Sequence, residues 1–192
     1  MNRLRIISLI AGLAVVLALP AAASGGKALG HTLRFDVVQF AQDTVFTGGT
    51  ALSRDATTGD TVLLTASGEA KPGKGDAAGG GTFVHRHSNG DLVAQGVWIA
   101  NSVASWEPVD GTLVGAGLTD GIGHLDATAA GNLRLNVTLM PEGGGSLPAV
   151  LTVHCQLIGS PETQLEGVTV DVGSFHFVPV HDEGFTLFHD LG

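Results

Sequence analysis

The chain has 192 residues, of which 29 are glycine and one is cysteine, and its formal net charge is −9. This acidity argues against nucleic acid or an anionic membrane surface as a partner, because both attract basic proteins. The single cysteine excludes an intramolecular disulfide, so we expect a hydrophobic core to hold the fold together.

The first 23 residues have the layout of a secretory signal peptide. Arg3 and Arg5 precede an apolar run at 6–19, and small residues follow at 20–23. The apolar run is short for a membrane span, which favours cleavage over the alternative of an uncleaved N-terminal anchor. We therefore expect a secreted or extracytoplasmic protein whose mature part, 24–192, is a single domain without a transmembrane segment. That part has seven basic and 18 acidic residues.

Alternation of apolar and polar residues predicts β-strands along the whole mature part. The expected strands are 33–37, 61–70, 82–87, 92–106, 133–139, 151–157, 168–172, 175–178 and 185–188. Glycine-rich turns separate them, and we expect 109–123 to be a long, exposed connection. This pattern predicts an all-β fold, which we interpret as an antiparallel barrel of about eight strands, with a β-sandwich as second choice.

The central feature of the sequence is a predicted hairpin with Asn89 and Gly90 as its two-residue loop, because Asn-Gly tolerates the positive φ of such turns. The resulting register pairs His87 with Leu92, His85 with Ala94, Phe83 with Gly96 and Gly81 with Trp98. Directly opposed residues share a face of the sheet. We therefore expect Phe83, His85 and Trp98 on one side of the hairpin.

The second strand of this hairpin is apolar on both faces. One face alternates large and small residues from Leu92 through Trp98 to Trp106, a pattern that suits the interior of a small barrel. The other face carries valines and an isoleucine between 93 and 103. Strands apolar on both faces are usually covered on both, so we expect a terminal segment or a second copy of the chain over this face, the latter giving a homo-oligomer.

Aromatic and small residues converge around this hairpin, which favours a non-enzymatic module that binds a small apolar ligand or a partner protein without a cofactor. The candidate ligand-binding residues are Phe83, His85, Trp98 and Trp106. The alternative for these aromatics is that they simply fill the core. A second reading, based on the glycine content and on strands apolar on both faces, is a surface or envelope assembly module that binds no ligand.

A third reading comes from the two histidines, because residues i and i+2 on a strand point the same way and could share a metal ion. Gly79, His85, His87, Asp91 and Gly96 form G-x5-H-x-H-x3-D-x4-G. This resembles the first motif of the cupins, G-x5-H-x-H-x3/4-E-x6-G, with aspartate for glutamate, a shorter final spacing and no second motif. The resemblance implies a metal-dependent barrel enzyme with His85, His87 and Asp91 as ligands of a divalent metal.

Cys155 alternates with Leu151, Val153 and Leu157, so we expect its thiol in the core, where it would be inert. His154 then points to the opposite, polar face, where we expect it in solvent. It cannot act as a base for the thiol. No other nucleophile is marked by a catalytic signature, which favours a binding role over catalysis.

Overall fold

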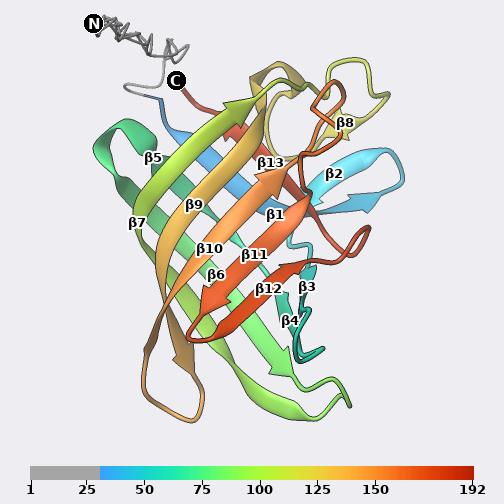
Figure 1. The fold of residues 1–192 in the computed structure, drawn as a ribbon. Coiled ribbons are helices and arrows are strands. Elements are labelled where there is room, and N and C mark those ends of the chain that lie inside the picture. Colours follow the sequence, from blue (N-terminus) through green and yellow to red (C-terminus); the bar gives the residue numbers. More distant parts are fainter. Residues whose placement is uncertain (1–30) are drawn as a thin grey trace, which may run out of the picture.

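The computed structural model describes residues 31–192, in which thirteen strands form one continuous sheet (Figure 1). The predicted signal peptide lies outside the described residues. The strands are β1 (Leu33–Ala41), β2 (Thr44–Thr47), β3 (Ala51–Asp55), β4 (Thr61–Leu64), β5 (Ser67–Lys71), β6 (Asp76–Arg86), β7 (Leu92–Val109), β8 (Thr119–Asp120), β9 (Thr128–Pro141), β10 (Leu147–Cys155), β11 (Gly167–Val172), β12 (Phe175–Pro179) and β13 (Phe185–Asp190).

Eight of these strands close into a ring. The order is β9, β10, β11, β12, β3, β4, β6 and β7, which pairs again with β9, and every pairing is antiparallel. The all-β prediction is therefore confirmed, and the ring corresponds to the predicted barrel. Four hairpin turns, β3–β4, β6–β7, β9–β10 and β11–β12, lie at the end of the ring opposite the C-terminus (Figure 1).

The long strands β6, β7 and β9 extend beyond this ring, and β5, β1 and β13 complete a second ring around their other end. Strand β6 exchanges its partner from β5 to β4 between Gly80 and Phe83. Glycine is required here, because a Cβ at Gly81 would clash with the carbonyl of Thr65. That carbonyl instead accepts a hydrogen bond from Nε1 of the buried Trp98, 3.0 Å away.

The core extends through both rings and consists of aliphatic residues with a few aromatics. Phe35, Leu133, Phe177 and Phe188 have no solvent-exposed surface. Cys155 is equally buried, which confirms the prediction of a core thiol. Burial raises its pKa well above the ordinary value, so the thiolate needed for nucleophilic chemistry is disfavoured.

The central hairpin has a longer turn than predicted. The structure confirms the pairing of His85 with Ala94, Phe83 with Gly96 and Gly81 with Trp98, but His87 does not pair with Leu92. The loop has three residues, because the backbone N–H of His87 donates to the carbonyl of Asp91. Only Gly90, with φ +91°, adopts the left-handed conformation, whereas a two-residue Asn-Gly turn requires positive φ at both positions.

Two β-bulges in β7 change which side chains face inward. The register shifts between Ala100 and Ser102 and again between Val103 and Ser105. Trp98, Val103 and Trp106 therefore all pack on the core, although their spacing is not a multiple of two. The predicted unbroken face from Leu92 to Trp106 is wrong at both Leu92 and Ala104, which are exposed.

The outer face of β7 is apolar and open in the single chain. Val97 and Ile99 each keep more than 40% of their surface exposed. No terminal segment within residues 31–192 covers them. A second copy of the chain over this face stays a prediction.

The segment 109–123 is a long connection whose residues are exposed or partly exposed, as predicted, but it is attached to the core. Leu113, Leu118 and Ile122 pack partly against the core. Asp120 fixes the segment to β13, since its carboxylate accepts a hydrogen bond from Nε2 of His189 at 2.7 Å, and both side chains are 2% exposed. The two helices of the described part, η1 (Pro72–Lys74) and η2 (Leu125–Ala127), are single 3₁₀ turns, and neither could cross a membrane.

Candidate functional site: an apolar cavity with a histidine–aspartate cluster

A cavity of about 500 Å³ lies inside the eight-stranded ring, at the end that carries the four hairpin turns. This volume lies within the range of small-molecule sites in proteins. The lining is almost entirely apolar, with three polar side chains. The lining residues are Val62, Leu64, Phe83, His85, His87, Val93, Ala94, Leu139, Pro141, Leu147, Pro148, Val170, Val172, Gly173, Ser174, Phe175 and Phe177.

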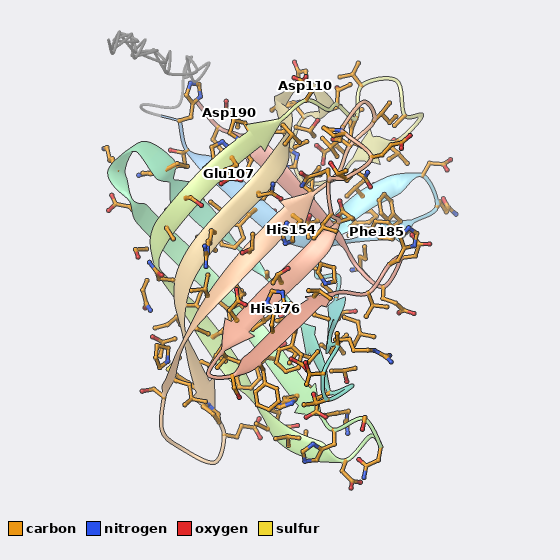
Figure 2. All side chains as sticks on the ribbon, viewed as in Figure 1. Glu107, Asp110, His154, His176, Phe185 and Asp190 are labelled. Carbon is orange, nitrogen blue, oxygen red and sulfur yellow. The ribbon has the colours of Figure 1, made fainter. Side chains whose placement is uncertain are left out.

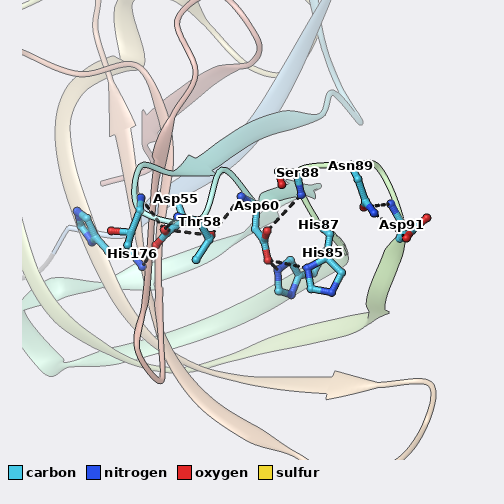
Figure 3. A network of polar contacts seen from close by, with 10 residues as sticks. Asp55, Thr58, Asp60, His85, His87, Ser88, Asn89, Asp91 and His176 are labelled. Carbon is cyan, nitrogen blue, oxygen red and sulfur yellow. Dashed lines mark hydrogen bonds and ion pairs between the residues drawn. The ribbon is translucent and has the colours of Figure 1, made fainter.

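The polar corner of the cavity is organised by Asp60, in the β3–β4 turn. One carboxylate oxygen, Oδ2, lies 3.3 Å from Nε2 of His85 and 3.1 Å from Nδ1 of His87 (Figure 3). The other oxygen accepts the backbone N–H of Ser88 at 3.2 Å. A single buried carboxylate thus orients both histidines, which sit at the end of β6 and in the turn after it.

The sequence of the β3–β4 turn explains why Asp60 occupies this position. Asp55 closes the turn by accepting the backbone N–H groups of Thr57 and Thr58, an arrangement that aspartate favours. Gly59 has φ +76°, which lets the chain reverse immediately before Asp60. The backbone N–H of Asp60 then bonds to the Thr58 hydroxyl, so the carboxylate projects toward β6 (Figure 3).

Electrostatics keep Asp60 ionised. Burial favours its neutral form, but hydrogen bonds from His87, His85 and the Ser88 backbone outweigh burial, and the pKa of Asp60 lies below the ordinary aspartate value. An ionised carboxylate only accepts hydrogen bonds, so each histidine nitrogen that faces it carries the proton.

Two aromatic rings pack against His85. The rings of Phe175 and Phe177 stack with centroids 5.5 Å apart, and the imidazole of His85 meets both edge-on at 5.4 and 5.3 Å. Such edge-to-face contacts fix the plane of the imidazole. Phe175, Phe177 and the imidazole of His85 thus form one aromatic wall of the cavity.

The residues predicted from the sequence divide into two groups. Phe83 and His85 line the cavity, as does His87 at its rim. Trp98 and Trp106 do not line it: Trp98 bonds to the Thr65 carbonyl, and Trp106 packs edge-on against Phe188 in the second ring. The structure thus joins only half of the predicted ligand-binding set around one hollow.

The three residues of the cupin-like alternative are not brought together. Asp91 is exposed and bonds to the side chain of Asn89, in the hairpin turn. His85 and His87 contact Asp60 instead, and their ring centroids are 6.4 Å apart. Within residues 31–192, no three or more His, Cys, Asp or Glu side chains have an arrangement that could hold a metal ion.

A second, polar hollow of about 490 Å³ lies on the outside of β7 and β9 to β12. Its residues include Glu107, His154 and His176, which lie across one face of the molecule in Figure 2. Our expectation that His154 is in solvent is wrong. It is 9% exposed, because Asn132 and Thr169 bond to its two ring nitrogens at 2.7 and 2.8 Å. Burial lowers its pKa to about 4.

Sequence reasoning missed Asp60, Phe175 and Phe177, which complete the site. Phe175 and Phe177 lie in a predicted strand at i and i+2, so they share a face, but nothing local indicated that β12 closes the ring next to β3. Asp60 follows a glycine in a turn, a pattern that carries no sign of a contact 25 residues away. No protein-family model, no curated protein and no solved structure matches this chain.

Proposed function

We propose that this protein is an exported, non-enzymatic binding module that takes a small apolar ligand into the cavity of its eight-stranded ring. The observation that supports this proposal most strongly is the lining of the cavity: about 500 Å³, open to solvent at one end, with walls that are mainly aliphatic and aromatic. A hollow of this size would hold poorly bonded water, because its walls offer few polar groups and both histidines already bond to Asp60. An apolar ligand would release that water and contact the walls.

A ligand could enter the cavity at the end of the ring that carries the hairpin turns. The β6–β7, β9–β10 and β11–β12 turns all contribute rim residues, among them His87, Leu147 and Ser174. His87 keeps 56% of its side chain exposed, whereas His85, deeper in the hollow, keeps 14%. A ligand entering at this rim would reach His85 and the aromatic wall last.

Ala94 offers a direct test, because it lines the cavity opposite His85 and a larger side chain there would fill the space. We expect Ala94→Phe to weaken binding of the fluorescent hydrocarbon diphenylhexatriene at least tenfold, a loss of about 1.4 kcal/mol. Ala104→Phe is the matched control, since Ala104 is exposed on the same strand and outside the cavity. Equal affinity in the two variants would contradict the proposed site.

Export is the second part of the proposal and rests on the charged, apolar and small-residue regions of 1–23. We expect protein isolated from its native host outside the cytoplasm to begin at about Ser24, as determined by mass spectrometry. A full-length chain in the cytoplasm would contradict export.

A further inference from the structure

The surroundings of His85 determine which of its two ring nitrogens carries the proton. Asp60 is an ionised acceptor, so Nε2 of His85 carries the proton and donates it to Oδ2, 3.3 Å away. In the neutral imidazole the other nitrogen, Nδ1, then has a free lone pair. Among residues 31–192 no group donates a hydrogen bond to Nδ1.

This free acceptor belongs to the wall of an apolar cavity. Phe175 and Phe177 meet the imidazole edge-on, and Val62 is its neighbour on β4. These apolar neighbours offer no hydrogen-bond donor to Nδ1. The O–H group of a ligand could donate a hydrogen bond to Nδ1. Water inside an apolar hollow provides this bond poorly.

The same surroundings limit what the ligand can carry. An anionic head would face the carboxylate of Asp60 across the imidazole and be repelled. A cation would need that carboxylate, which already accepts three hydrogen bonds. Further polar groups would find only His87 and Ser174, both at the rim, so each would be left unpaired deeper inside.

We propose that the ligand is a neutral, largely apolar molecule with a single hydroxyl group, an aromatic or aliphatic alcohol, whose O–H donates to Nδ1 of His85. This inference rests on the proposed apolar-ligand function and gives the ligand an orientation: hydroxyl at the aromatic wall, hydrocarbon toward Leu139, Pro141 and the rim.

Two probes of nearly the same shape test this, para-butylphenol and para-butylanisole, which differ in the O–H donor. We expect the unmodified protein to bind the phenol about tenfold more tightly, the worth of one hydrogen bond, when the two displace diphenylhexatriene. His85→Phe should reduce that ratio to below about twofold while still binding diphenylhexatriene. His87→Phe, at the exposed rim, should keep the tenfold ratio.

The outcomes separate the two proposals. If diphenylhexatriene does not bind the unmodified protein, the proposed function fails, and this inference fails with it. If it binds and both probes displace it equally well, the cavity is an apolar site without a hydroxyl preference, and only this inference is overturned. That comparison needs no variant, so it holds even where His85→Phe fails to fold. A tenfold preference that persists in a folded His85→Phe variant would place the acceptor elsewhere.

Discussion

Replacing Asp120 by alanine should lower the free energy of unfolding by about 3 kcal/mol. Asp120 and His189 form a hydrogen-bonded pair with both side chains almost fully buried, and removing one partner leaves the other without its hydrogen bond. Nδ1 of His189 already has no hydrogen-bond partner within the described part of the chain. The carboxylate also accepts the backbone N–H groups of Ile122 and Gly123, so its loss removes three hydrogen bonds that hold this part of the chain against β13.

Urea unfolding of the purified protein measures this effect, and Asp126→Ala is the matched control. Asp126 is exposed in η2, directly after this segment, so its removal should change stability by less than about 0.5 kcal/mol. Asp120→Ala should also speed amide hydrogen exchange in 113–123. An equal stability for both variants would show that the segment is not fixed by the pair with His189.

The second large effect concerns the pH dependence of the free energy of unfolding. It is hidden in the unmodified protein, because Glu166 and His154 change stability in opposite directions as pH rises. Burial raises the pKa of Glu166 to about 7, although Gln156 and Thr186 donate hydrogen bonds to it. Burial lowers the pKa of His154 to about 4. The ordinary values are 4.5 for glutamate and 6.5 for histidine. Each of these two pKa shifts corresponds to about 3 kcal/mol in the free energy of unfolding.

The signs follow from proton binding. Between pH 4.5 and 7 the folded state holds the proton of Glu166 that the unfolded state has released, so this group makes stability fall as pH rises. Between pH 4 and 6.5 the unfolded state binds a proton at His154 that the folded state refuses, so this group makes stability rise with pH. The two effects cancel where the windows overlap.

Single substitutions should therefore reveal slopes that the unmodified protein lacks. We expect Glu166→Gln to gain about 3 kcal/mol of stability as pH rises from 4 to 6.5, the contribution of His154 alone. His154→Gln should lose about 3 kcal/mol from pH 4.5 to 7, the contribution of Glu166 alone. Urea unfolding at several pH values measures both. Two variants with the same flat profile as the unmodified protein would contradict the assigned pKa values.

The sequence was sufficient to predict the architecture, because alternation in the strands directly reports the two faces of a sheet. Leu133 to Leu139 and Leu151 to Leu157 bury their odd-numbered residues as predicted. The alternation of residues was misleading where a β-bulge interrupts it. The bulges in β7 bring Val103 to the core and Ala104 to the surface, and no residue in that stretch marks a bulge.

The candidate site was predictable only in part, for a different reason. Phe83 and His85 come from one hairpin, and a register shift between His85 and Arg86 keeps their predicted pairing although the turn is one residue longer than predicted. Asp60, Phe175 and Phe177 reach the same cavity through the closure of the ring, which pairs β12 with β3 and β4 with β6. Those pairings join segments far apart in the chain. His154 shows the same limit, since its burial depends on Asn132 and Thr169 from neighbouring strands.

The most direct test of ligand binding inside the ring is an amide NMR titration of the mature protein with para-butylanisole, which lacks the hydroxyl and so tests the cavity alone. We expect saturable shift changes at His85, Ala94 and Ser174, which line the cavity, and none at Thr152 and Thr163, which line the polar hollow outside the ring. Saturable changes confined to Thr152 and Thr163, or changes that do not saturate at any of these residues, would contradict the account.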